Sequence, residues 1–186
     1  MIKDSIDQQL SQAVACLQIG GIVAYPTEAV YGLGCDPFNQ KAVEKLFHVK
    51  QRPMEKGVIL VAASVGQIKG WVELEGFAWQ DKVLASWPGP VTWVLPLKKT
   101  MPDWVTGGRD TVAIRVSDHS VVQQLCEQFN GPIVSTSANL TSHPPAKSCA
   151  EIKAVFADKV YCIDADLGDL AQPTQIWDAR SLKQLR

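Results

Sequence analysis

Short apolar stretches alternate with amphipathic helical stretches along the chain, and this alternation restricts the possible folds more than any other feature of the sequence. Residues 5–18 place apolar side chains at helical spacing, and Ser5 with Gln8 predicts a capping box at their start. Residues 22–25 then predict a short buried strand. Further helices are predicted after Asn39, over 77–86, after an Asp118 cap and after a Ser148–Glu151 capping box, and further strands over 57–62, 91–95, 111–116, 132–135, 160–163 and 175–177.

Helices interleaved with strands favour an α/β fold. The 186 residues are enough for one domain with a sizeable core, which we predict over 1–186 with its core at about 7–180. Several predicted strands follow one another without a helix between them, so the sheet is predicted to be mixed rather than purely parallel. The sequence shows no long linker, internal repeat or low-complexity tract.

The net charge of −1 argues against a protein that coats long nucleic acids, because such proteins are usually strongly basic. It does not exclude a local basic pocket. The five cysteines are odd in number and lack C-x-x-C spacing, which predicts free thiols in a reducing compartment rather than a disulfide framework or a zinc site. The N-terminal residues contain no apolar signal core, and no apolar run approaches the roughly 20 residues of a membrane helix. Together these features predict a cytoplasmic protein outside the membrane.

Two polar segments directly follow predicted strands, at the strand ends where ligands gather in open α/β sheets. Residues 26–34 offer the hydroxyl of Thr27, the carboxylate of Glu28 and glycines that allow close backbone approach. Residues 135–139 offer three hydroxyls and an amide, which can bind phosphate or carboxylate oxygens. On composition alone, an ordinary polar turn explains each segment equally well.

Cations mark two further positions. Lys50, Arg52 and Lys56 lie within seven residues, a spacing that suits either a phosphate clamp or a solvated loop. Arg115 stands inside an apolar strand and shares a face with Thr111, because strand residues four apart point the same way. A buried cation needs an anionic partner, which is either a protein carboxylate or a ligand.

Common cofactor motifs are missing. The sequence contains neither a Walker motif nor G-x-G-x-x-G, and its three histidines form no metal-binding pattern. No metal ligand is therefore predicted.

Five segments, taken in order, resemble the YrdC-like threonylcarbamoyl-AMP synthases in their short, single-domain bacterial form. They are Pro-Thr-Glu-x-x-Tyr-Gly-Leu at 26–33, Lys-x-Arg-Pro at 50–53, Pro-Gly-Pro-x-Thr at 88–92, the arginine at 115 and Ser-x-Ser-Ala-Asn at 135–139. No single segment is specific, but the ordered set is. The resemblance implies an α/β domain with a twisted mixed sheet, flanking helices and a concave basic cavity.

The resemblance also implies a reaction. L-threonine, bicarbonate and ATP would be joined into threonylcarbamoyl-AMP with release of pyrophosphate, and Mg²⁺ is expected with the ATP. Separate tRNA threonylcarbamoyl transferase proteins would then modify the adenosine next to the anticodon, and the family is compatible with direct binding of tRNA or structured RNA.

The same resemblance assigns roles to individual residues. Lys50 and Arg52 would be the catalytic residues that hold the triphosphate. Threonine would be contacted by Thr27, Ser135 and Arg115, the last through the substrate carboxylate. The remaining nucleotide contacts would come from Thr111, Ser137 and Asn139.

Two positions depart from the family pattern. Thr141-Ser142 stands where Ser-Gly is usual, and Gln175 interrupts a Ser-Thr-Ile-x-Asp pattern, so neither position receives a role.

The alternative function is an RNA-binding module, for double-stranded RNA or tRNA, without catalysis. A carbamoyl-phosphate-using transferase is a weaker candidate, because the acylphosphatase and zinc-finger segments that accompany that role are missing from this sequence.

Overall fold

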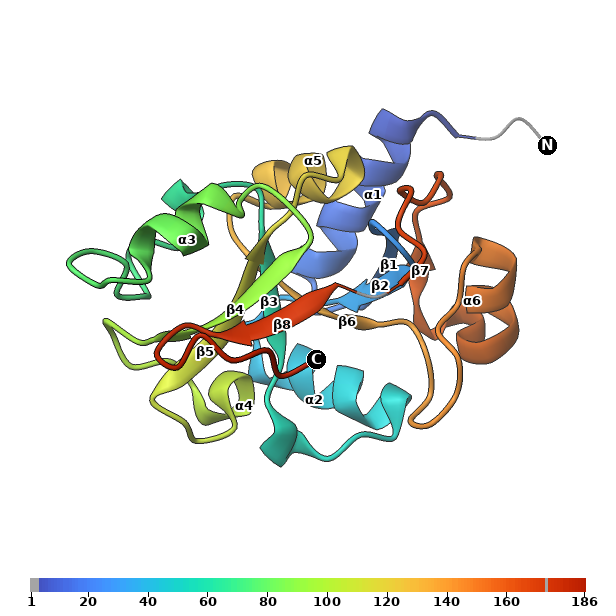
Figure 1. Cartoon of the computed structure of the whole chain (residues 1–186). Helices are drawn as coiled ribbons and strands as arrows, with labels where there is room; N and C mark the ends of the chain where they lie inside the picture. Colours follow the sequence, from blue (N-terminus) through green and yellow to red (C-terminus); the bar gives the residue numbers. More distant parts are fainter. Residues whose placement is uncertain (1–3, 173) are drawn as a thin grey trace.

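The computed structural model describes residues 4–172 and 174–186, and its strands form one mixed sheet (Figure 1). The strand order in this sheet is β7-β1-β2-β6-β3-β5-β4-β8. Three neighbouring pairs, β1/β7, β3/β5 and β4/β8, are parallel and the other four are antiparallel, which confirms the predicted mixed sheet. The strands are β1 Val23–Pro26, β2 Tyr31–Gly34, β3 Ile59–Ala62, β4 Val91–Pro96, β5 Thr111–Val116, β6 Ile133–Ser137, β7 Tyr161–Cys162 and β8 Gln175–Asp178.

Side-chain caps mark the start of some helices and not of others. The Ser5–Gln8 capping box is complete, so α1 starts as predicted. At α6 the box is half formed, because the Glu151 carboxylate accepts from the Lys147 N–H rather than from that of Ser148. The predicted Asp118 cap is wrong, since α5 starts two residues later without a side-chain cap. The helices are α1 Ile6–Gln18, α2 Gln40–Lys50, α3 Gln80–Ala85, α4 Asp103–Thr106, α5 Ser120–Phe129 and α6 Cys149–Phe156, with short 3₁₀ turns η1 Met54–Lys56, η2 Val65–Gln67 and η3 Ala157–Lys159.

The glycine-rich segment 26–34 contains a strand that the sequence pattern did not predict. β2 pairs with β1 and β6, and the ring of Tyr25 lies directly against it. A Cβ atom on Gly34 would lie 2.5 Å from the Val134 carbonyl oxygen and 2.9 Å from the Tyr25 ring. A side chain at this position would therefore clash, and glycine lets β2 approach β6 beneath the tyrosine ring.

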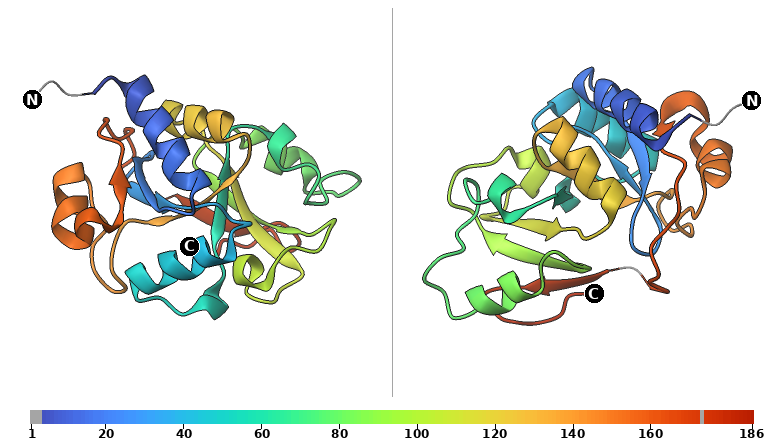
Figure 2. Two further views of the ribbon diagram at one scale, coloured as in Figure 1. Left: turned by 180° about the vertical axis from the view of Figure 1, so that it is seen from behind. Right: turned by 90° about the horizontal axis from the view of Figure 1, so that it is seen from above.

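Two apolar clusters hold the helices to the sheet. Helices α1 and α5 pack together around Leu10, Leu17 and Leu125, and this smaller cluster reaches the sheet at Val61 and Ile133 (Figure 2). The larger cluster takes buried side chains from α2, α3, α4 and α6, and from alternate residues of the central strands. Helices α1 and α5 cover only part of one sheet face, and they contact it at Val61 and Ile133. On the rest of this face, no helix covers the residues of β4, β5 and β6.

The cysteines correct one prediction. Cys149 and Cys162 form a disulfide across 13 residues of sequence with a Cα–Cα separation of 5.9 Å, whereas Cys16, Cys35 and Cys126 are free as predicted. Cysteine spacing could not reveal this pair, because the start of α6 meets β7 only in the folded chain. Among residues 4–172 and 174–186, no helix combines the length and apolar character needed to cross a membrane.

Candidate functional site

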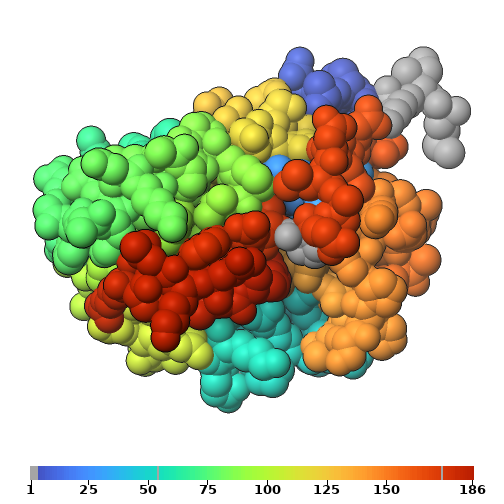
Figure 3. Space-filling model, in the orientation of Figure 1, coloured from blue at the N-terminus to red at the C-terminus, as the bar shows by residue number. Residues whose placement is uncertain are grey.

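A cavity of about 540 Å³ opens on the uncovered sheet face. Thr111, Ala113 and Arg115 of β5 line the cavity together with Val112, while Ile114 and Val116 are buried in the larger cluster. Strands β3, β4, β6 and β8 contribute further lining residues. In the space-filling view, the C-terminal segment (red) lies across this side of the molecule (Figure 3). The shared face predicted for Thr111 and Arg115 is confirmed.

The cavity is basic. Five cations line it and none of the described lining residues is acidic; the cations are Arg52, Lys56, Arg109, Arg115 and Arg186. Burial, and next the charge of Arg186, lowers the pKa of Arg52, while burial and then Arg115 lower that of Arg186. Neighbouring guanidinium groups therefore repel one another inside the cavity, and a bound anion would relieve that repulsion.

Protein carbonyls and hydroxyls hold most of these cations in place. Arg52 donates from Nη2 to the Gly57 carbonyl at 3.1 Å and from Nη1 to Thr136 Oγ1 at 3.4 Å, and its buried Nε finds no partner in the described chain. Arg109 donates to the carbonyls of Thr106 and Glu55. These contacts aim the side chains while leaving part of their positive charge unneutralised.

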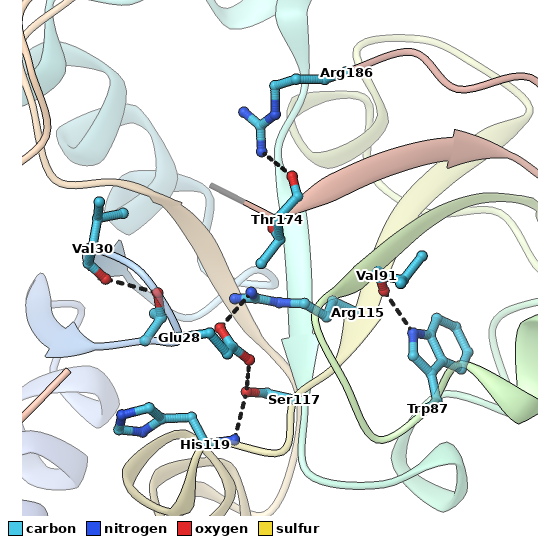
Figure 4. Close-up of polar contacts among 10 residues, drawn as sticks. Glu28, Val30, Trp87, Val91, Arg115, Ser117, His119, Thr174 and Arg186 are labelled. Carbon is cyan, nitrogen blue, oxygen red and sulfur yellow. Dashed lines mark hydrogen bonds and ion pairs between the residues drawn. The ribbon is translucent and has the colours of Figure 1, made fainter. Parts of the chain in front are cut away.

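Arg115 has a protein carboxylate as its partner. Its Nη1 lies 2.6 Å from Oε2 of Glu28, and the side chains are only 5% and 7% exposed (Figure 4). The other Glu28 oxygen accepts from the Ser117 hydroxyl at 2.6 Å. Of the two partners that the sequence left open, the structure supplies the protein carboxylate. The buried Nε of Arg115 has no partner among the described residues.

Three predicted hydroxyl groups also line the cavity, those of Thr27, Ser135 and Ser137. Thr27 Oγ1 donates to the Val30 carbonyl at 2.7 Å, so towards a ligand this oxygen acts as an acceptor. Ser137 lies at the end of β6 and donates its hydroxyl to the Asn139 side chain at 2.6 Å.

Lys50 and Asn139 do not line the cavity. Lys50, only 3% exposed, donates to the carbonyls of Ser137 and Asn139 and to Asn139 Oδ1. Its three N–H groups thus have three protein acceptors in the loop after β6. Burial, and next the charge of Arg52, lowers the pKa of Lys50 to about 8. The assignment of Lys50 and Asn139 as ligand contacts stays a prediction.

Three lining cations escaped the sequence-based assignment. Lys56 was visible as part of a cationic segment but received no role, and Arg109 follows a Gly-Gly pair before β5. Arg186 gave no sequence signal. It reaches the cavity because residues 182–186 fold back beside β8, where the Ile176 N–H donates to the Arg186 carbonyl and the Arg186 guanidinium donates to Thr174 (Figure 4).

Comparisons with known proteins find relatives that match nearly the whole chain. The chain is 52% identical to a protein of Xanthomonas euvesicatoria pv. vesicatoria (strain 85-10) named threonylcarbamoyl-AMP synthase, with 98% of each chain covered. It is 49% identical to the protein of that name from Hydrogenovibrio crunogenus (strain DSM 25203 / XCL-2), with 95% of this chain and 96% of that chain covered.

A solved structure and a family model also match this chain. The crystal structure of P. abyssi Sua5 complexed with L-threonine matches with a TM-score of 0.84 and 32% identity, covering 95% of this chain and 52% of that one, so this chain spans about half of it. A sequence model named Sua5_yciO_yrdC, described as "Telomere recombination", matches residues 15–186. The chain belongs to the Sua5/YciO/YrdC family.

Proposed function

We propose that this protein is an L-threonylcarbamoyladenylate synthase, a nucleotidyltransferase that converts L-threonine, bicarbonate and ATP into threonylcarbamoyl-AMP and pyrophosphate. The observation that carries the proposal is the cavity itself. It brings the polar groups Thr27, Arg115 and Ser135 together with a cluster of cations and has no acidic side chain in its described lining. Such a lining suits a small anionic substrate beside a polyphosphate.

The triphosphate binds among Arg52, Lys56, Arg109 and Arg186. Arginine forks and a lysine point charge neutralise phosphate oxygens. The hydroxyls of Thr111 and Ser137 lie in the same lining, which supports their assignment to the nucleotide.

Threonine binds beside Arg115, whose guanidinium donates to the substrate carboxylate while Glu28 keeps the other side of the guanidinium paired. Thr27 Oγ1 already donates to Val30, so it accepts a hydrogen bond from the substrate amino or hydroxyl group. Ser135 completes this part of the lining.

Lys50 acts differently from Arg52. Because its ammonium is buried and bound to the Ser137–Asn139 loop, we assign it to fixing the loop that presents the Ser137 hydroxyl. Asn139 belongs to the same network, since its amide donates to the carbonyls of Leu140 and His143.

The chemistry needs positioning and charge neutralisation more than a protein nucleophile. The threonine amine and bicarbonate form a carbamate with loss of water. A carbamate oxygen then attacks the α-phosphorus of ATP, and the pyrophosphate leaves with its negative charge spread among the cavity cations.

Mg²⁺ would enter with the nucleotide rather than on ligands of the chain. The described residues contain no cluster of three or more His, Cys, Asp and Glu able to hold a metal, and the described cavity lining lacks carboxylates. Phosphate oxygens and water would therefore coordinate the ion.

The product would pass in the cytosol to the tRNA threonylcarbamoyl transferase proteins that modify the adenosine next to the anticodon. Mass spectrometry of the purified protein with ATP, L-threonine and bicarbonate tests the proposal. Threonylcarbamoyl-AMP and pyrophosphate should form together, and omission of bicarbonate should abolish both. Tight binding of tRNA with no adenylate formed under these conditions would contradict the proposal in favour of an RNA-binding module.

A further inference from the structure

The Arg115 side chain lies between the cavity and the carboxylate of Glu28. Arg115 lines the cavity, whereas Glu28 does not, and the two side chains meet at 2.6 Å with little exposure of either (Figure 4). Substrate can therefore reach the guanidinium but not the carboxylate. Glu28 is placed to act on the substrate only through Arg115.

Ser117 fixes this carboxylate from the opposite side. The residue is fully buried, and its hydroxyl donates to Glu28 Oε1 at 2.6 Å while accepting from the His119 N–H at 3.2 Å. Its backbone is fixed as well, since its N–H donates to the Ala62 carbonyl and its own carbonyl accepts from Gln123. The Ser117 hydroxyl thus has one orientation available.

The backbone of Glu28 is equally constrained. The N–H groups of Gly168 and Leu170 donate to the carbonyls of Thr27 and Glu28. A Cβ atom on Gly168 would lie 2.9 Å from the Glu28 Cα, so a glycine is needed for this close approach. Neither the main chain nor the carboxylate of Glu28 is free to move.

We propose that Ser117 and Glu28 are positioning residues that hold the Arg115 guanidinium in the plane required to recognise the substrate carboxylate. The inference rests on the proposed function, because it takes an amino acid as the ligand of Arg115. A guanidinium fixed before binding loses less conformational freedom when the carboxylate arrives, and its fork geometry is already correct.

A different role for the same pair has the opposite consequence. If Glu28 competed with the substrate for Arg115, neutralising the carboxylate would release the guanidinium and strengthen carboxylate binding. If Glu28 positions Arg115, the same change weakens carboxylate binding. The direction of the effect therefore separates the two roles.

The test compares two ligands by calorimetry: L-threonine, and L-threoninol, in which a hydroxymethyl group replaces the carboxylate. Ser117→Ala and Glu28→Gln should each weaken L-threonine binding by about tenfold, the loss of a well-oriented charge-assisted hydrogen bond. L-threoninol and ATP should bind as they do to the unaltered protein. Glu151→Gln, which removes an exposed carboxylate on α6, is the matched control and should change none of the three affinities.

The remaining outcomes overturn the inference. Equal weakening of L-threonine and L-threoninol, with a lowered melting temperature, would show that the pair only supports the fold. Stronger L-threonine binding by Glu28→Gln would show competition, and unchanged affinities in both variants would show that Arg115 needs no support. Failure of the unaltered protein to bind L-threonine would overturn the proposed function and this inference with it.

Discussion

At the scale of single residues, the neighbouring cations Lys50 and Arg52 have different roles in this protein. The three N–H groups of Lys50 are directed at acceptors of one loop, whereas Arg52 lines the cavity. Both belong to the same short sequence segment, and both pKa values are lowered by burial. The structure thus separates a cation that shapes the site from one that can contact a ligand.

Lys50 makes the binding of ATP sensitive to pH. Above its pKa of about 8 a neutral amine has only two N–H groups for three acceptors, so the loop after β6 loosens as positive charge is lost. We expect ATP affinity to fall by about threefold to tenfold between pH 7 and pH 9, as for loss of one hydrogen bond.

Stability should change in the opposite direction. The pKa of Lys50 is about 8 in the folded state, below its ordinary value, so between these two values the unfolded state binds more protons and the free energy of unfolding rises with pH. Titrations and urea unfolding of the protein and of Lys50→Met across this pH range check both statements. Identical pH profiles for the two proteins would contradict them.

At the scale of elements, loops that are bound to the sheet form part of the cavity lining. The segment between β6 and α6 contributes Pro145 to the cavity lining, and the Cys149–Cys162 disulfide joins the start of α6 to β7 at the end of this segment. The Tyr31 hydroxyl, which donates to the Ala165 carbonyl at 2.9 Å, lies against Cys149. Helix α6 is therefore fixed to the sheet by covalent and polar contacts.

Reduction of the disulfide should cost stability. Closing a loop of this length restricts the unfolded chain by about 3 kcal/mol in the chain-entropy account. We expect a phosphine reductant to lower the free energy of unfolding of the protein by about this amount, measured by urea unfolding. Cys149→Ser should be equally destabilised and should not respond to the reductant. A protein indifferent to reductant would show that the two thiols are not joined in solution.

The close approach of β2 to β6 at Gly34 leads to a second prediction about stability. Gly34→Ala places a Cβ atom against the Val134 carbonyl and the Tyr25 ring, so we expect a loss of about 2 kcal/mol from overpacking. Gly70→Ala is the control, because nothing lies within 4 Å of an added Cβ there. Thermal unfolding of both variants checks the difference, and equal stability of the two would contradict the proposed clash.

At the scale of the whole molecule, the cavity collects charges from distant parts of the sequence. Arg52 follows α2, Arg109 precedes β5, and Arg186 arrives from the segment that folds back beside β8. The net charge of −1 hides this concentration of positive charge, because acidic residues are excluded from the described lining. A polyphosphate therefore meets a strong local field on a nearly neutral protein.

Arg186 should contribute to this field although it lies far from the other motifs in sequence. Arg186→Ala is expected to weaken ATP binding by about 1.5–3 kcal/mol, the cost of a lost charge-assisted contact. Arg180→Ala removes an arginine from the same region whose partner, Asp110, is 74% exposed, and it should leave ATP affinity unchanged. Calorimetric titration with ATP measures the affinity of both variants. An equal loss of ATP affinity in the two variants would show that Arg186 makes no specific contact with ATP.

The sequence alone determined the α/β class, the mixed sheet, most strands and helices, and six residues of the cavity lining. The fold class and the elements follow from local periodicity, whereas the six lining residues were assigned through the resemblance to the family: they are Thr27, Arg52, Thr111, Arg115, Ser135 and Ser137. The strand β2 was missed because its glycines carry no apolar pattern, and its pairing depends on Tyr25 packing against it.

Only the tertiary structure decided which side chains face one another. Local pattern could not choose between a carboxylate and a ligand as the partner of Arg115, because Glu28 is 87 residues away in sequence. The same reason applies to the disulfide, to Arg186 in the cavity and to the loop contacts of Lys50, which span 87 and 89 residues. Periodicity reports on neighbours along one element, whereas these contacts exist only after the sheet brings separate elements together.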